Sequence, residues 1–291
     1  MGFVSALRLI AELCKVKITF FVSLTAALGY ILGAYTIDAK MMLPVLGIFL
    51  LACGASALNQ VQESASDKLM ERTKNRPIPS GAISRTSAFI ISAVIIFSGI
   101  AVMYFGTNFE SLFFALMTLA WYNGVYTPLK KITPFAIIPG SLVGALPPVS
   151  GWLAAGGNLN NPAIWMVALY FFVWQIPHFW ILVMIYGKDY EKGGYPTLMK
   201  KFNTKQLLRI TFNWILAVIA VALILPVANI LNYTFSAIPI LALSIWFLYE
   251  SVKFLRSDGD HKKLINTFVR INIYTLMIIV ILSFDKLIKI F

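Results

Sequence analysis

The chain has 291 residues, of which 59% are hydrophobic and only 12% are charged. A soluble domain carries roughly 25% charged residues, so this composition excludes an ordinary soluble protein and predicts a polytopic membrane protein. The two cysteines, Cys14 and Cys53, have neither metal-ligand spacing nor the pattern of a disulfide framework. We expect both to be small apolar residues.

Apolar segments of transmembrane length follow one another along the chain. A hydrocarbon core of about 30 Å needs roughly 20 apolar helical residues, which predicts one all-α transmembrane domain over residues 1–291. Pro147 and Pro148 are expected to break the fifth segment, and the first segment, which lacks a small-residue cleavage site, to be retained as a span. The nine segments are 17–35, 42–62, 87–106, 110–127, 134–156, 163–187, 208–231, 234–255 and 268–289.

The basic residues are distributed unequally between the two faces of this predicted bundle. Of the 24 Lys and Arg residues, 21 lie in the N-terminal tail and in alternate connections, whereas the opposite loops contain only Lys40. This asymmetry predicts a cytoplasmic N-terminus, a cytoplasmic working face and an external C-terminus. Topology thus accounts for the net charge of +12 without nucleic acid as a partner.

The end of the second segment has an acidic row followed by a basic cluster. Asn59, Glu63 and Asp67 are spaced by four residues, so a helix places them on one face over about 12 Å. Two carboxylates and an amide oxygen suit Mg²⁺, which binds one or two carboxylates together with phosphates and water. The cations that follow favour a ligand shared with the metal, namely a diphosphate. These cations are Arg72, Lys74 and Arg76. The alternative is a helix that merely becomes polar as it leaves the membrane.

The segment NQVQESASDKLMERTKNRPIPSG, residues 59–81, resembles the first acidic motif of the UbiA superfamily of intramembrane prenyltransferases. Its part LMERTKNRPIPSG is similar to the haem O synthases, also called protohaem IX farnesyltransferases. Glu63 stands where the superfamily usually has Asp, and Ala65 and Ser66 replace a typical Arg-Asp pair. The resemblance implies that Asn59, Glu63 and Asp67 are catalytic ligands of Mg²⁺.

A second resemblance to the haem O synthases lies in residues 171–202, where Pro-His-aromatic is followed by Asp-Tyr and Gly-x-Pro. It implies that Asp189 is the fourth catalytic metal ligand, with Lys188 on the diphosphate and Tyr190 near the acceptor. His178 is eleven residues before Asp189, which places it about 16 Å deeper along a helix. Its imidazole is expected either to contact haem iron or to hold a kink beside Pro177.

The segment WYNGVYTPLKKITPFAIIPGSLVGALPPVSGW, residues 121–152, also resembles the family. Tyr126 and Lys130 are expected at the cytoplasmic edge, with Tyr126 near the acceptor and Lys130 on the diphosphate. Lys130 and its neighbour Lys131 could equally serve only as determinants of topology.

The resemblance implies a bundle around a central cavity, in a bacterial inner membrane, and an activity. The enzyme would transfer the farnesyl group of farnesyl diphosphate to a vinyl group of haem B, with Mg²⁺ as cofactor, to give haem O. The implied partners are these two substrates, the lipid bilayer, and haem A synthase or oxidase assembly factors.

Two alternatives stay open at this point. One is a prenyltransferase of the same superfamily that acts on an aromatic or quinone precursor. The other is a membrane transporter, although transporters usually carry ionisable residues at the membrane midplane, whereas here the carboxylates gather at one face.

Overall fold

The structure is a computed structural model that describes residues 3–228 and 230–288, and all of its regular elements in these ranges are helices. The first half consists of α1 Phe3–Cys14, α2 Val16–Ala34, η1 Ala39–Met41, α3 Met42–Asp67, α4 Arg85–Gly106, α5 Phe109–Ala120, the π-helix η2 Trp121–Tyr126, α6 Thr127–Leu129, α7 Ile137–Gly140 and α8 Leu142–Ala154. The second half consists of α9 Pro162–Lys192, η3 Leu198–Lys200, α10 Thr204–Ile224, η4 Thr234–Ser236, α11 Ala237–Leu255 and α12 His261–Leu287.

Eight helices in the described ranges are long and apolar enough to cross a membrane. They correspond to eight of the nine predicted segments, so the expected count of nine is not confirmed. The remaining segment, 110–127, forms α5, η2 and α6, a helical path in which a π-helix interrupts the α-helix. Residue 289, the last of the predicted ninth segment, lies outside the described residues, and so does residue 229 in the predicted seventh segment.

The expected break at Pro147 and Pro148 is wrong. Helix α8 runs through both prolines, and the interruption lies earlier, at Ser141 between α7 and α8. Consecutive prolines remove two backbone donors, but a proline ring keeps φ near the helical value, so neighbouring packing can keep the helix intact. In α9, Pro177 is likewise accommodated inside a helix that continues to Lys192.

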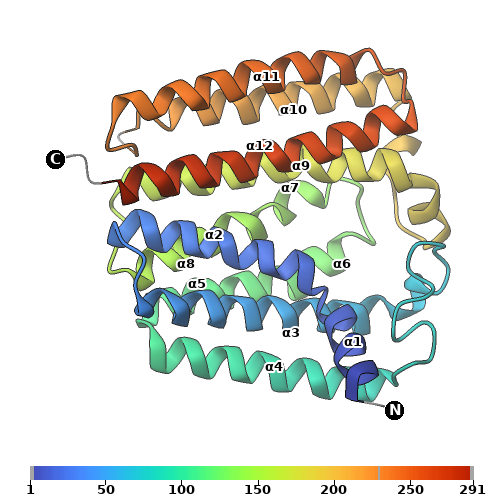
Figure 1. Ribbon diagram of the computed structural model, residues 1–291. Coiled ribbons are helices and arrows are strands. Elements are labelled where there is room, and N and C mark those ends of the chain that lie inside the picture. The colour runs from blue at the N-terminus through green and yellow to red at the C-terminus, as the bar shows by residue number, and fades with distance from the viewer. Residues whose placement is uncertain (1–2, 229, 289–291) are drawn as a thin grey trace.

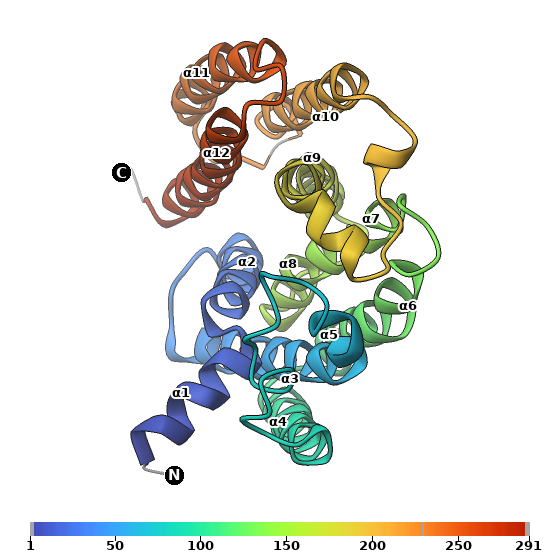
Figure 2. The same cartoon turned by 90° about the vertical axis from the view of Figure 1, so that its right-hand side faces the viewer.

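The long helices lie side by side with their axes roughly along one direction (Figure 1). Viewed from the end, α2, α3, α4, α5 and α8 form one group and α9 to α12 form another (Figure 2). Contacts of α8 with α9 and of α12 with α2 join the groups. The connections 68–84, 193–203 and 256–260 lie at the same end of the bundle (Figure 1), and this end contains the predicted site.

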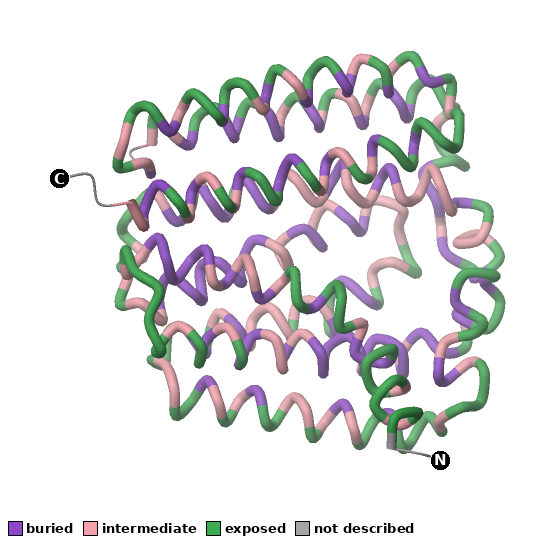
Figure 3. The backbone as a smooth tube through the Cα atoms, viewed as in Figure 1, coloured by how far each residue is buried: buried purple, intermediate pink, exposed green. Residues whose placement is uncertain are grey.

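Many residues on the outer faces of the helices are exposed (Figure 3), and many of these are apolar, as expected for lipid contact. On α4 the exposed set includes Phe89, Val94, Phe97 and Phe105, and Phe105 is 85% exposed. The interior of the second group is a continuous apolar core that includes Tyr170, Phe247 and Tyr274. An apolar exterior around an apolar core supports an integral membrane protein.

Two glycines allow the backbones of α2 and α8 to touch. A Cβ added at Gly151 would lie 1.9 Å from the carbonyl oxygen of Ala26, and one at Gly29 would lie 1.9 Å from that of Pro148. Small residues at helix crossings are the usual way to bring transmembrane backbones together. This crossing fixes α2, and with it the N-terminal segment that reaches the site.

Candidate active site

The predicted acidic row lies on the last turns of α3 and is buried. Asn59, Glu63 and Asp67 are 1%, 6% and 0% exposed, and four-residue spacing on one helix places them along one face, as the sequence predicts. Burying a carboxylate is costly unless a partner compensates its charge. The row is therefore stable only because of what surrounds it.

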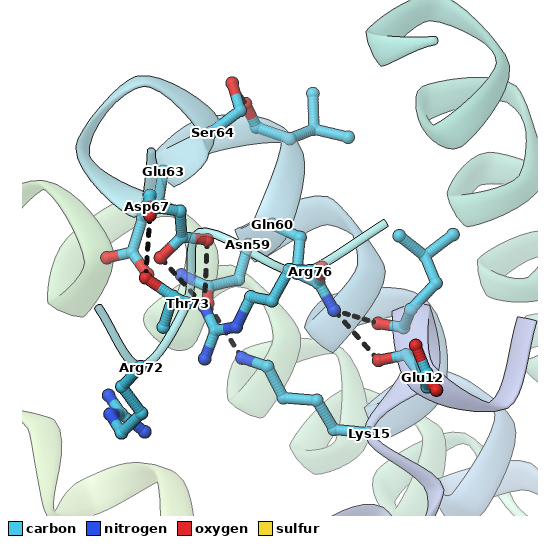
Figure 4. Close-up of polar contacts among 12 residues, drawn as sticks. Glu12, Lys15, Asn59, Gln60, Glu63, Ser64, Asp67, Arg72, Thr73 and Arg76 are labelled. Carbon is cyan, nitrogen blue, oxygen red and sulfur yellow. Dashed lines mark hydrogen bonds and ion pairs between the residues drawn. The ribbon is translucent and has the colours of Figure 1, made fainter. Parts of the chain in front are cut away.

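Each member of the row has its own cation, and Figure 4 shows two of these cations, Lys15 and Arg76. The Lys15 Nζ donates to Asn59 Oδ1 at 3.2 Å, and Arg76 Nη1 donates to both carboxylate oxygens of Asp67 at 2.9 and 2.8 Å. The Lys130 Nζ lies 2.6 Å from Glu63 Oε1, an ion pair by distance although its angles fall outside hydrogen-bond geometry. Arg76 and Lys130 thus lie where the sequence predicts diphosphate ligands, and here they neutralise the acids.

Lys15 was counted from the sequence only as a determinant of topology. It connects α1 to α2 in a left-handed backbone conformation, with φ 50° and ψ 48°. Burial, reinforced by the nearby cations Arg76 and Lys130, lowers the pKa of Lys15 to about 7. No periodicity connects Lys15 to Asn59, 44 residues later, so only the fold reveals this contact.

Asp189 holds the loop that follows the acidic row. Its two carboxylate oxygens accept the backbone N–H groups of Glu71 and Arg72 at 2.7 and 3.1 Å. The Thr73 hydroxyl in the same loop donates to the backbone carbonyl of Asp67 at 2.9 Å. Asp189, which lies within α9 and not in the predicted loop, is therefore joined to the row through residues 71–73.

Aromatic side chains from α9 hold Arg72. Its guanidinium donates to the hydroxyl of Tyr190 at 3.1 Å and lies over the rings of Tyr186 and Tyr190, 5.2 and 5.5 Å from their centroids. Lys74 forms an ion pair with Glu71 instead, and Lys188 is exposed. The structure therefore brings Arg72 and Tyr190 together, whereas Lys74 and Lys188 have no contact with the row.

The π-helix η2 presents polar groups to α3. The Asn123 side chain donates to the Ala55 carbonyl at 3.0 Å and to Gln62 Oε1 at 3.1 Å, while Asn59 Nδ2 donates to Thr127 Oγ1 at 3.1 Å. A π-helix has a wider turn than an α-helix and is frequent at functional sites. Thr127, the first residue of α6 directly after the π-helix, orients the amide of Asn59 so that its oxygen faces Lys15.

Two tyrosines border the acidic row. The Tyr126 ring is buried between Phe179, at 6.4 Å, and the ammonium of Lys130, which lies 4.9 Å from its centroid. Burial close to the Glu63 carboxylate raises the pKa of Tyr195, a residue that sequence reasoning did not select. Tyr126 thus lies beside the cation that pairs with Glu63, and Tyr195 lies beside Glu63 itself.

His178 lies deeper in the bundle, between aromatic rings. Its imidazole is 4.7 Å from the ring centroids of Trp174 and Phe268 and 5.2 Å from that of Phe179. Its buried Nδ1, like the nearby Gln175 Oε1 on the same helix, has no hydrogen-bond partner within the described residues. A buried unpaired polar atom needs an explanation, and both readings made from the sequence remain predictions.

The donor set of the row fits Mg²⁺ together with a ligand. Asn59, Glu63 and Asp67 offer buried hard oxygens that already require positive charge close by. Across the part of the chain that the structure describes, no group of three His, Cys, Asp or Glu residues is arranged to hold a metal. An ion at this row would therefore need further oxygens, and phosphate oxygens are the usual supplement for Mg²⁺.

Helices long enough to cross a membrane, arranged around a buried row of acids and cations, define an intramembrane prenyltransferase. The chain belongs to the UbiA prenyltransferase family, whose pattern it matches over residues 20–274. It is 32% identical to the protoheme IX farnesyltransferase of Oleidesulfovibrio alaskensis, with 97% of this chain and 98% of the relative covered. A 39% identity to the protoheme IX farnesyltransferase of Geobacter sulfurreducens covers 63% of this chain and 68% of the relative.

Solved structures share the fold. A structure of digeranylgeranylglyceryl phosphate synthase has a TM-score of 0.77 at 18% identity, covering 97% of this chain and 98% of that one. A UbiA homolog from Archaeoglobus fulgidus bound to GPP and Mg²⁺ has a TM-score of 0.73 at 15% identity, covering 96% and 99%. The all-helical UbiA architecture expected from the sequence is thereby confirmed.

Proposed function

We propose that this prenyltransferase transfers the farnesyl group of farnesyl diphosphate to a vinyl group of haem B, giving haem O and diphosphate. The observation that carries the proposal is the buried row Asn59–Glu63–Asp67, in which each oxygen ligand is paired with a cation. The names of the relatives, protoheme IX farnesyltransferase, support the choice of donor and acceptor.

The row Asn59, Glu63 and Asp67 would hold Mg²⁺, with Asp189 as the fourth ligand in the proposal. When bound, the ion supplies positive charge at the diphosphate oxygens, where negative charge develops as the carbon–oxygen bond breaks. Asp189 already orders the loop after the row by accepting its backbone N–H groups. In this role it would connect ligand binding to the position of Arg72.

The cations of the row would bind the leaving group. Arg76, Lys130 and Lys15 each contact one member of the row, Asp67, Glu63 and Asn59 respectively, and in the proposal they turn from these residues to the diphosphate. A guanidinium matches two phosphate oxygens at once, so Arg76 and Arg72 suit this task well. Lys74 and Lys188 lie further out, where they would attract the anionic donor along the loop surface.

In the proposed reaction, the bond between C1 of the farnesyl group and its oxygen breaks, and the electron pair leaves with diphosphate. The vinyl group then forms a carbon–carbon bond to C1, and water adds to the resulting cation with loss of a proton. The apolar aromatic surroundings of His178, Tyr126 and Tyr190 would exclude stray water until this step. In the proposal these three residues contact the porphyrin.

The proposal also states where in the membrane the reaction takes place. A lateral opening of the expected central cavity would admit both apolar substrates from the bilayer of a bacterial inner membrane. The row would face the cytoplasm, with the C-terminus outside, as the basic loops indicate. Product transfer to haem A synthase, or to oxidase assembly factors, is the expected partnership.

The test compares haems extracted from cells with and without the protein by mass spectrometry, and then supplies the purified protein with haem B and farnesyl diphosphate. We expect haem O only when the protein and both substrates are present. Prenylated product from 4-hydroxybenzoate, without haem O, would favour the aromatic-acceptor alternative. Transport of a solute without any prenylated product would favour a transporter.

A further inference from the structure

A second basic site lies at the same end of the bundle as the acidic row, between α11 and α12. A cavity of about 330 Å³ is lined by Lys253, Phe254, Arg256, Lys263, Asn266, Thr267 and Arg270. Its lining belongs to the second group of helices, at the periphery of the bundle and away from α3 (Figure 2). The prenyl-transfer chemistry proposed above uses none of these residues.

One buried acid organises part of this cavity. Glu250 is 8% exposed and forms ion pairs with Lys253 at 2.9 Å and with Arg270 at 2.5 Å. Four cations thus line the cavity, whereas Glu250, the carboxylate that pairs with two of them, lies behind the lining. Arg256 and Lys263 form no ion pair with any described residue. A neighbouring acid in the loop, Asp260, is engaged with the backbone N–H of Lys263 as a helix cap at 2.9 Å. The excess positive charge therefore favours an anion.

The cavity lies where a membrane lipid places its headgroup. Its residues are at the end of one candidate span, Thr234–Leu255, and at the start of another, His261–Leu287. Within about two turns toward the membrane interior, α11 exposes Ile245 and Tyr249 at 61% and 64%, and α12 exposes Ile273 at 45%. The Lys253 ammonium lies 4.2 Å from the centroid of the Tyr249 ring, which connects the charged cavity to this apolar surface.

We propose that the cavity between α11 and α12 binds the phosphate headgroup of an anionic phospholipid, whose acyl chains lie along the exposed residues of α11 and α12. Basic pockets at the cytoplasmic ends of transmembrane helices commonly bind anionic headgroups. Charges that served topology alone would not need to converge on one cavity. The unpaired Arg256 and Lys263 are the phosphate ligands, and Glu250 holds Lys253 and Arg270 in position.

The test uses the purified full-length protein in a neutral detergent. Thermal unfolding and native mass spectrometry are followed while phosphatidylglycerol, phosphatidylcholine or inorganic phosphate is added. The variant Arg256→Gln/Lys263→Gln is compared with Arg85→Gln/Lys262→Gln, which removes the same charges from exposed positions outside the cavity. The conservative variant Arg256→Lys/Lys263→Arg keeps the charge and controls for misfolding.

We expect phosphatidylglycerol to bind and stabilise the wild-type protein, the exposed-charge control and the conservative variant. At roughly 1 kcal/mol per basic residue near a membrane surface, the cavity variant should bind about 30-fold more weakly. Equal binding of phosphatidylcholine would overturn the preference for an anion. Equal stabilisation by inorganic phosphate would overturn the lipid as occupant, and equal loss in the exposed-charge control would reduce the cavity to general surface charge.

Discussion

At the scale of single residues, Asp67 is the acid with the tightest surroundings, because it is fully buried and both of its oxygens accept from Arg76. Changing Asp67→Asn preserves size but removes the charge that would hold Mg²⁺. We expect haem O formation to fall about 100-fold or more, with membrane insertion unchanged. Asp38→Asn, the same change at the other end of the bundle, is the control, and undiminished turnover of Asp67→Asn would refute the metal role.

Lys15 is a second residue whose role can be measured. If its ammonium binds the diphosphate, Lys15→Met should raise the KM for farnesyl diphosphate about tenfold or more, since a hydrogen bond to a charged group contributes about 1.5–3 kcal/mol. Lys15→Arg should restore most of the affinity. Equal defects in both variants, with kcat and not KM reduced, would instead indicate that Lys15 only maintains the joint between α1 and α2.

Which site residues the sequence could predict depends on how the fold connects them. Asn59, Glu63 and Asp67 share one helix, so their spacing alone places them together. Lys15, Thr127 and Tyr195 reach the row only through tertiary contacts between distant segments, and no local pattern marks them. The opposite case is Lys188, which stands beside Asp189 in the sequence but points to the surface, because neighbours on a helix are about 100° apart.

At the scale of helices, the crossing of α2 and α8 is the most sterically demanding contact. Gly151→Ala would place a methyl group 1.9 Å from a backbone oxygen, and backbone cannot move aside as a side chain can. We expect the free energy of unfolding to fall by about 2 kcal/mol, measured as a lower thermal midpoint in detergent. Gly124→Ala, where a Cβ meets nothing within 4 Å, is the matched control; equal midpoints for the two variants would contradict this account.

Helices were predictable where hydropathy alone decides, and less so where backbone details matter. The bounds of α4, Arg85–Gly106, for example, are close to those of the predicted segment 87–106. By contrast, the π-helix at Trp121–Tyr126 cannot be recognised from hydropathy. The prolines Pro147 and Pro148 suggested a break, but packing against neighbouring helices keeps α8 intact. Helix α1 was missed because its exposed Val4, Leu7 and Ile10 make up a segment too short to span a membrane.

At the scale of the whole molecule, orientation is the property that remains to be measured. The distribution of basic residues predicts that the end containing Ser80 faces the cytoplasm and the end containing Asn160 faces outside. In intact cells, we expect an impermeant maleimide to label Asn160→Cys but not Ser80→Cys until the membrane is permeabilised. Both native cysteines are buried and should stay unlabelled. The reverse pattern of labelling would invert the proposed topology.

The pairing of every residue of the row with a cation also bears on how a catalytic cycle would end. Diphosphate, once freed, would sit among tightly bound positive groups, and its escape could then limit the overall rate. Glu63 and Asp67 are anions that compete with diphosphate for Lys130 and Arg76, and they already lie within contact distance of these cations. As diphosphate dissociates, these carboxylates would re-form their ion pairs with Lys130 and Arg76. The arrangement seen in the structure would thereby help to release the product before the next donor binds.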